Sequence, residues 1–261
     1  MNNVAQHAVS EEVEKAMRMK SMFSHEFPVL YHGTSAASLP TIAEKGLLPR
    51  GGGTKNNWEH TIGSNEQTVY LTDSYAMYFA FTAEQEHEGG AVLEIDTSML
   101  DPERFVPDED FLEQASRGMH VPHTPGWLSK TNDMKRRTMW FREHAHWFAA
   151  EISLRGLGTV GYRGRIPFAA VKRVAVFEHD LLMEASMVFD PTITVLNYKI
   201  LGERYRAATK SIFDSGAGEL SLAESMQIGA RTVPLHQIDT VRALSRMPRI
   251  EVNPLYGAEA I

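Results

Sequence analysis

The sequence predicts a mixed α+β fold. Six short apolar segments have the length and composition of β-strands, and loops and helices of unequal length separate them: 29–34, 69–72, 91–95, 151–154, 158–163 and 171–177. Strands and helices do not alternate regularly, which argues against a doubly wound parallel sheet. With 43% hydrophobic and 23% charged residues among 261, the chain has the composition of a globular protein with one sizeable core.

Two helices are predicted in the N-terminal part of the chain. In residues 8–22 the apolar side chains approximate one helical stripe, formed by Val9, Val13, Met17 and Met22. A second helix is predicted over 38–47. Ser38 is expected to cap its N-terminus, Pro40 lies in its first turn, and Gly46 is a stop signal.

Residues 51–67 are predicted to form a loop that begins with the glycines 51–53. A loop of this length is unusual inside a compact domain, so we expect it to be mobile or to cover a ligand. Glycines of this kind can also cradle phosphates, although a strand-to-helix context is missing. Asp73 or Ser74 is expected to cap the next helix, which runs from about 75 to 86.

The middle of the chain is less regular. Residues 101–114 are acidic and rich in turn signals, and 118–129 are predicted to be irregular because of their glycines and prolines. Residues 133–148 have the pattern of a helix with several aromatic side chains, and 167–170 are expected to form one helical turn.

The character of the chain changes after His179. A helical stripe follows, formed by Tyr198, Leu201, Tyr205, Ala208 and Ile212. We therefore divide the chain into an N-terminal helical segment (1–27), a central domain (28–180) and a mainly helical C-terminal extension (181–261).

Composition excludes several classes of function. The chain has no cysteine, which rules out disulfides, thiolate zinc sites and cysteine nucleophiles. It shows neither an apolar run of membrane-spanning length nor the apolar segment of a signal peptide, so we expect a cytoplasmic protein. The net charge of -7 argues against a broad basic surface for nucleic acid.

Three residues are candidates for chemistry. His32 lies near the end of the first predicted strand, and Tyr70 lies in the second. Glu151 falls in the apolar run 147–154, where a charged group needs a partner or a function. Each residue also has a structural explanation, as a hydrogen-bonded histidine, a core tyrosine or a glutamate that faces water from an edge strand.

Together these residues resemble the ADP-ribosyltransferase superfamily, in the branch with a His, Tyr and Glu triad. That branch includes the poly(ADP-ribose) polymerases, bacterial nucleic-acid-modifying toxins and, more distantly, the RNA 2′-phosphotransferases. A strand-borne His-Gly-Thr comes first, a Tyr followed by a small residue and Asp second, and a Glu that opens a late strand third. Here His32–Thr34, Tyr70–Asp73 and Glu151 occur in that order, before a proline-containing turn in 164–174. The resemblance covers roughly residues 28–178 and implies a split β-sheet core with flanking helices.

The resemblance implies NAD+ as co-substrate, with no metal. Cleavage at ribose C1′ builds positive charge on the sugar, so the enzyme needs a carboxylate, aromatic walls and hydrogen bonds to the ribose. Glu151 would stabilise the cationic state, His32 would bind the nucleotide, and the Gly33 backbone would bind the nicotinamide amide. Tyr70 would stack on the nicotinamide, with Tyr78 as a second wall. The implied cofactor-binding set is His32, Gly33, Thr34, Tyr70 and Tyr78.

The acceptor is expected to be nucleic acid, with RNA favoured over DNA. Four basic residues precede Glu151 and form the predicted nucleic-acid contact: Lys135, Arg136, Arg137 and Arg142. The absence of an Arg-Ser-Glu motif disfavours the arginine-modifying branch, and His144 and His146 do not share a helix face as metal ligands would. We therefore expect a bacterial or phage toxin or defence effector, with a possible antitoxin partner. A protein acceptor, RNA 2′-phosphotransfer and an inactive nucleotide-binding module remain alternatives.

Overall fold

A computed structural model of the protein describes residues 23–49, 64–83, 89–118, 127, 136, 139–140, 143, 150–177, 179, 193 and 195–214. The predicted helix at 8–22, residues 51–63 of the predicted loop and most of 133–148 lie outside these residues. Among the described helices, none has both the length and the apolar character needed to cross a membrane.

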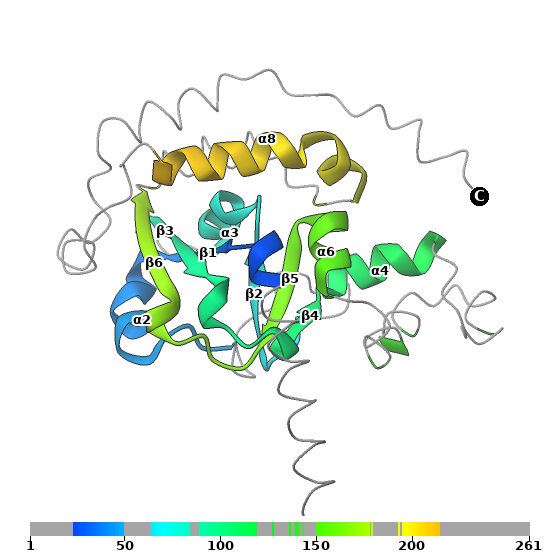
Figure 1. Ribbon diagram of the computed structural model, residues 1–261, viewed down its shortest axis with the longest axis horizontal. Coiled ribbons are helices and arrows are strands. Elements are labelled where there is room, and N and C mark those ends of the chain that lie inside the picture. Colours follow the sequence, from blue (N-terminus) through cyan, green and yellow to red (C-terminus); the bar gives the residue numbers. More distant parts are fainter. Residues whose placement is uncertain are drawn as a thin grey trace, which may run out of the picture.

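Six strands form one sheet in the order β4-β5-β2-β1-β3-β6, and every neighbouring pair is antiparallel (Figure 1). The strands are β1 (Val29–Ser35), β2 (Thr68–Thr72), β3 (Gly90–Asp96), β4 (Phe105–Pro107), β5 (Thr159–Arg163) and β6 (Val171–Phe177). The α+β class is therefore confirmed, and five of the six predicted strands are present.

The prediction of a strand at 151–154 was wrong. These residues belong to the helix α6 (Ala150–Leu157), whose buried residues are Ala150, Ser153, Leu154 and Leu157. Their spacing of three and four residues is that of one helix face. A window of four residues is too short to distinguish helical periodicity from that of a strand. Over all of 150–157 the spacing of the buried residues is helical. Glu151 consequently lies in the first turn of a helix.

The acidic segment that the sequence analysis described as turn-rich contains regular structure. It forms the 3-10 turn Pro102–Arg104, the strand β4 and the helix α4 (Glu109–Gly118). The carboxylate Oδ1 of Asp108 accepts a hydrogen bond of 2.8 Å from the backbone N–H of Asp110. Acidic residues are favourable at this end of a helix, because unpaired N–H groups point toward them there.

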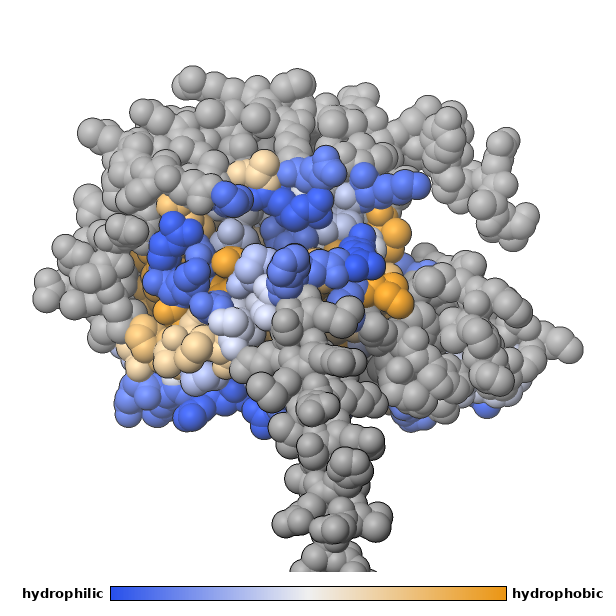
Figure 2. All heavy atoms as spheres, viewed as in Figure 1, coloured by the Kyte–Doolittle hydropathy of each residue, from blue (hydrophilic) through white to orange (hydrophobic). Residues whose placement is uncertain are grey.

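Helices cover both faces of the sheet (Figure 1). The helices α3 (Ala76–Ala83) and α8 (Val195–Asp214) share an apolar cluster with one face. The helix α2 (Leu39–Lys45) and the start of α6 contribute to a second cluster on the other face. The surface in Figure 2 is hydrophilic along its lower left edge, near α2, whose side chains Glu44 and Lys45 are exposed.

The ends of α2 follow the predicted positions. Pro40 lies in the first turn of α2, and Gly46 ends that helix with a positive φ of 75°. Ser38 makes no capping hydrogen bond. In the turn before α3, Thr72 Oγ1 accepts hydrogen bonds of 3.0 Å from the backbone N–H groups of both Ser74 and Tyr75.

The predicted C-terminal helix is present as α8, and it packs on the sheet. Its buried residues recur at helical spacing: Tyr198, Gly202, Tyr205, Thr209 and Phe213. The ring of Phe213 stacks on that of Tyr31 in β1, with centroids 5.5 Å apart. The C-terminal end of α8 is held by Arg173, which donates to the Phe213 carbonyl at 2.8 Å and pairs with Glu94 of β3.

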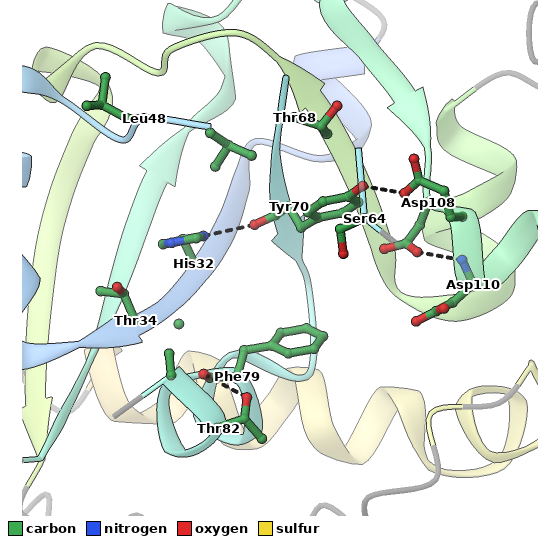
Figure 3. A pocket seen from close by; sticks show the side chains of 14 residues that line it. His32, Thr34, Leu48, Ser64, Thr68, Tyr70, Phe79, Thr82, Asp108 and Asp110 are labelled. Atoms are coloured by element: carbon green, nitrogen blue, oxygen red, sulfur yellow. Dashed lines mark hydrogen bonds between the residues drawn. The ribbon is translucent and has the colours of Figure 1, made fainter. Parts of the chain in front are cut away.

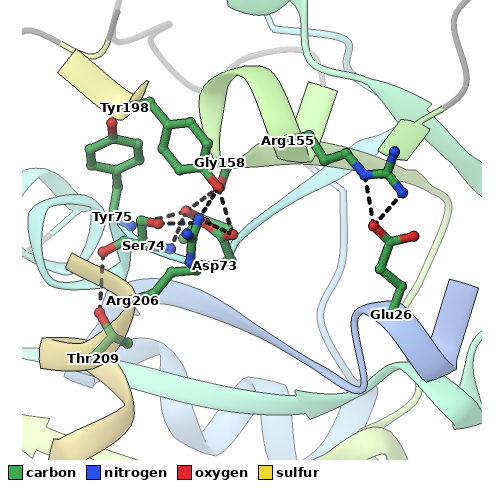
Figure 4. A network of polar contacts seen from close by, with 10 residues as sticks. Glu26, Asp73, Ser74, Tyr75, Arg155, Gly158, Tyr198, Arg206 and Thr209 are labelled. Carbon is green, nitrogen blue, oxygen red and sulfur yellow. Dashed lines mark hydrogen bonds and ion pairs between the residues drawn. The ribbon is translucent and has the colours of Figure 1, made fainter. Parts of the chain in front are cut away.

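A buried polar network joins α8 to the turn between β2 and α3 (Figure 4). Tyr198 donates a hydrogen bond of 2.8 Å to Asp73 Oδ2, and Arg206 lies 3.3 Å from the same oxygen. Thr209 donates to the carbonyl oxygen of Ser74 at 3.1 Å. Burial raises the pKa of Asp73, while hydrogen bonds from Ser74, Tyr198 and Arg206 favour its ionised form.

Gly33 of β1 lies directly beneath α3. A Cβ atom on Gly33 would come within 2.1 Å of the Ala76 carbonyl oxygen and 2.4 Å of the Ala80 backbone nitrogen. Both contacts involve backbone atoms of a packed helix, which cannot rotate away. The missing side chain at position 33 therefore allows α3 to approach β1 this closely.

We expect Gly33→Ala to lower the free energy of unfolding by about 1–3 kcal/mol, the usual cost of overpacking a well-packed core. Urea denaturation followed by circular dichroism measures this change. Thr34→Ser, on the next residue, adds no atom and serves as the control. An unchanged denaturation midpoint in the Gly33 variant would show that α3 can move aside without cost.

Candidate active site

The sheet splits between β1 and β2. These two strands share a single register pair, Tyr31 with Thr72, whereas β1 pairs with β3 along its whole length. Beyond that pair, the His32 side chain spans the gap, and its Nδ1–H donates a hydrogen bond of 2.9 Å to the Tyr70 carbonyl oxygen. Since a carbonyl oxygen can only accept, the proton of the neutral ring lies on Nδ1, and Nε2 is then an acceptor.

A pocket of about 240 Å³ lies beside this split (Figure 3). Thr68 and Tyr70 of β2 form one wall, and Phe79 and Thr82 of α3 form the opposite one. The other described residues that line it are His32, Gly33, Thr34, Leu48, Ser64, Val69, Ala83, Asp108, Glu109 and Asp110. Among the described residues, the lining therefore combines two aromatic rings with three acidic residues.

Tyr70 connects the aromatic wall to the acidic one. Its hydroxyl donates a hydrogen bond to the carboxylate of Glu109 and accepts one of 2.7 Å from the Asn65 backbone N–H. Burial and then the nearby negative charge of Glu109 raise the pKa of Tyr70, so the hydroxyl keeps its proton and remains a donor. Glu109 is thus oriented by a fixed hydrogen bond at the edge of the pocket.

The carboxyl groups of Asp108 and Asp110, on either side of Glu109, have raised pKa values. Burial, followed by the charge of Glu109, raises the pKa of Asp108 to about 7. Burial also raises the pKa of Asp110, with further contributions from Asp108 and Glu113. Carboxyl groups with raised pKa values inside a pocket are typical of functional sites, because folding alone gains nothing from them.

The structure brings four of the predicted cofactor-binding residues into this one pocket: His32, Gly33, Thr34 and Tyr70. The fifth, Tyr78, does not line it. On a helix the next residue points about 100° away, and Phe79 therefore forms the α3 wall while Tyr78 packs beside it, with ring centroids 5.8 Å apart. Sequence periodicity could not decide which aromatic face of α3 meets the pocket.

Glu151 is not among the residues that line the pocket. The next strand after Glu151 is β5, and it opens with Thr159 instead of an acidic residue. The end of β4 lies beside the start of β5, since Pro107 pairs with Val160. Asp108 and Glu109 follow directly after that end. The acidic groups of the pocket therefore come from the segment that joins β4 to α4.

Sequence reasoning missed these acidic residues, although a signal was present. Three acidic residues in succession, 108–110, follow the short apolar segment Phe105–Pro107. A strand of three residues is too short for periodicity to reveal. Only the pairing of β4 with β5 places the acidic run beside Tyr70.

The other predicted contacts lie mainly outside the described residues. Of the four basic residues only Arg136 is described; its side chain is exposed, and its guanidinium carbon lies 4.5 Å from the centre of the Trp127 ring. Lys135, Arg137, Arg142 and the glycines 51–53 lie outside the described residues. Within the described part of the chain, no group of three or more potential ligands is arranged to hold a metal ion.

The raised pKa of Asp108 predicts a pH dependence of stability. An unfolded aspartate titrates near pH 4, so between about pH 4 and 7 the folded protein holds a proton that the unfolded chain has released. The free energy of unfolding contributed by this group therefore falls as pH rises through that window.

Asp108→Asn keeps the capping oxygen but cannot titrate. Its stability relative to the wild type should rise by about 1 kcal/mol or more between about pH 5 and 8.

Urea denaturation at both pH values measures this difference. The exposed Glu44→Gln variant serves as the control, for which we expect the same difference at each pH. If the stability of Asp108→Asn relative to the wild type does not change with pH, then Asp108 titrates normally in the folded protein.

Comparison with known proteins found no counterpart for this arrangement. No protein-family model, no curated protein and no solved structure matches the chain. Any functional conclusion therefore has to rest on the pocket itself: its two aromatic walls, the histidine that spans the split sheet, and the carboxylates at the start of α4.

Proposed function

We propose that this protein cleaves NAD+ at the bond between nicotinamide and ribose and transfers the ADP-ribosyl group to an acceptor. One observation carries the proposal. His32, Tyr70 and a glutamate, Glu109, meet in a single pocket where the sheet splits, with the Tyr70 hydroxyl bound to the Glu109 carboxylate. These are the three residue types of the triad, but the carboxylate is one that the sequence did not indicate.

The chemistry of the pocket suits the nicotinamide end of NAD+. The nicotinamide ring is flat and positively charged, so the faces of Tyr70 and Phe79 and the nearby carboxylates all favour it. A pocket of about 240 Å³ is small for a whole dinucleotide, so we place only the nicotinamide and its ribose inside. The anionic pyrophosphate would then lie away from the acidic wall.

Glu109 takes the role that the sequence analysis gave to Glu151. When the C1′–N bond breaks, both electrons go to the nicotinamide nitrogen and positive charge develops on the ribose. A buried carboxylate close to that sugar lowers the energy of the cationic state, because the water that would screen it is excluded. An acceptor oxygen or nitrogen then bonds to C1′ and loses its proton. With water as acceptor the products are ADP-ribose, nicotinamide and a proton.

We further propose nucleic acid as the acceptor, with RNA favoured. Arg136 and Trp127 support this, because an exposed guanidinium held over an exposed ring offers both a phosphate contact and a stacking surface. The acidic wall disfavours the RNA 2′-phosphotransferase alternative, since a 2′-phosphate in the pocket would be repelled by 108–110. The labelling experiment below distinguishes a protein acceptor from a nucleic-acid acceptor.

Substitution of two glutamates tests the catalytic assignment. We expect Glu109→Gln to lower kcat for nicotinamide release by about 10²–10³-fold, because it removes the negative charge but keeps an oxygen that accepts from Tyr70. Glu151→Gln should keep a rate close to that of the wild type, because Glu151 lies in the first turn of α6 and is not among the residues that line the pocket. Chromatography of nicotinamide released from NAD+ gives both rates, and thermal denaturation checks that each variant is folded.

Exposed Glu44→Gln is the control for the loss of one negative charge. Loss of activity in Glu151→Gln with a fully active Glu109→Gln would restore the assignment made from the sequence. If the wild type releases no nicotinamide from NAD+ in the presence of RNA, DNA or a cell lysate, the proposed reaction is wrong.

Labelled NAD+ tests the acceptor. After incubation with a lysate, we expect label in the RNA fraction, and Arg136→Ala should reduce that label several-fold while nicotinamide release into water stays unchanged. Lys45→Ala, which removes an exposed cation from α2, is the matched control. Label confined to protein would replace the nucleic-acid proposal with the protein-acceptor alternative.

A further inference from the structure

We propose that helix α8 sets the distance between the two aromatic walls of the pocket, and that Tyr198 and Arg206 are positioning residues although neither of them lines the pocket. The inference rests on the proposed function only for the identity of the ligand. It gives a role to a helix of the C-terminal extension that the sequence predicts. Binding in the pocket should then depend on residues that do not line it.

The two walls of the pocket are joined by one short turn. Tyr70 forms the first wall from β2, and Phe79 forms the second wall from α3 (Figure 3). Only residues 73–75 lie between β2 and α3. A change in the direction of this turn moves α3 relative to β2, and the distance between the walls changes with it.

The split in the sheet has an apex, and α8 lies across it. β1 and β2 meet at the pair Tyr31 with Thr72, and the pocket lies to one side of that pair. Phe213, near the end of α8, stacks on the ring of Tyr31. Near the start of α8, Tyr198 donates to Asp73, the residue that follows Thr72. In Figure 1, α8 runs above the sheet from β6 toward α6. One helix thus holds both sides of the apex.

The contacts of α8 with the turn fix its direction as well as its position. The Tyr198 hydroxyl and the Arg206 guanidinium both bind Asp73 Oδ2, at 2.8 and 3.3 Å (Figure 4). Thr209 donates to the Ser74 carbonyl oxygen at 3.1 Å. Asp73 is only 8% exposed, so water cannot readily replace a lost donor. Apolar packing tolerates sliding, whereas these directional contacts hold the turn in one orientation.

Aromatic contacts carry the position of α8 to the pocket wall. The rings of Tyr198 and Tyr205 contact the ring of Tyr75, with centroids 6.2 and 5.7 Å apart. The Tyr75 ring in turn meets that of Phe79, with centroids 6.5 Å apart. The Phe79 backbone N–H also donates to the Tyr75 carbonyl oxygen at 3.0 Å. Because buried side chains are closely packed, a shift of α8 reaches the Phe79 wall through Tyr75.

A distance measured across the pocket tests this inference on the full-length protein. The chain has no cysteine, so Glu66→Cys and Thr82→Cys, at exposed positions beside the two walls, provide the only sites for thiol-specific spin labels. Double electron–electron resonance then gives the distribution of distances between the labels. We expect one narrow distribution in this background and a broader one when Tyr198→Phe is added, because Asp73 loses a donor and the turn is held less firmly.

Thr209→Val, which removes the hydrogen bond to Ser74, should broaden the distribution as well. Ile42→Val is the matched control, because it weakens the core on the opposite face of the sheet and lowers stability without touching the turn. An unchanged distribution in both the Tyr198 and the Thr209 variants overturns the inference. Equal broadening in Ile42→Val also overturns it, since α8 would then contribute stability alone.

Kinetics connects this distance to the proposed reaction. If about one third of Tyr198→Phe molecules keep the wild-type distance, KM for NAD+ should rise about threefold while kcat stays within about twofold. Simple loss of folded protein would lower kcat and leave KM unchanged. A broadened distribution in Tyr198→Phe, with no cleavage of NAD+ by the wild type, supports the positioning role and refutes the proposed reaction. Cleavage of NAD+ with an unchanged distribution does the reverse.

Discussion

The separation of β1 from β2 is the constraint on which the candidate site depends. A fully paired sheet would leave no room between these strands, but they share only the pair Tyr31 with Thr72. The absence of a side chain at Gly33 lets α3 lie against β1, and α3 supplies the Phe79 wall. His32 bonds to Tyr70 across the gap, so the split is held at a fixed width by a side chain instead of a ladder.

The C-terminal helix α8 also stabilises this arrangement, through contacts with the residue that follows β2. Asp73 follows β2, the strand that carries Tyr70, and its buried carboxylate is satisfied by Tyr198 and Arg206 of α8. A buried charge that lost these donors would be costly, so the turn between β2 and α3 and the helix α8 stabilise each other. The pocket thus depends on residues distant in sequence that never touch it.

The acidic wall shows a conflict between folding and function. Helix α4 gains from acidic residues at its start, where Asp108 bonds to the N–H of Asp110. The same residues are brought together beside Tyr70 in a buried place, which raises their pKa values. A structural role would be served by one capping residue. The additional acidic groups oppose folding, and local rules are broken in this way chiefly at functional sites.

The sequence alone determined the α+β class and five of the strands, because apolar runs bounded by Pro and Gly are local signals. Only the family resemblance associated His32 with Tyr70, which the structure places in contact. The sequence could not assign 151–154, where four residues fit a strand and a helix equally well, nor choose between Tyr78 and Phe79 on α3. The sequence also could not identify Glu109 as a carboxylate of the pocket, for a different reason. Glu109 meets Tyr70 through the pairing of β4 with β5, a contact between segments far apart in the chain. Non-local pairing leaves no periodic trace in a strand of three residues, so only the tertiary structure decided it.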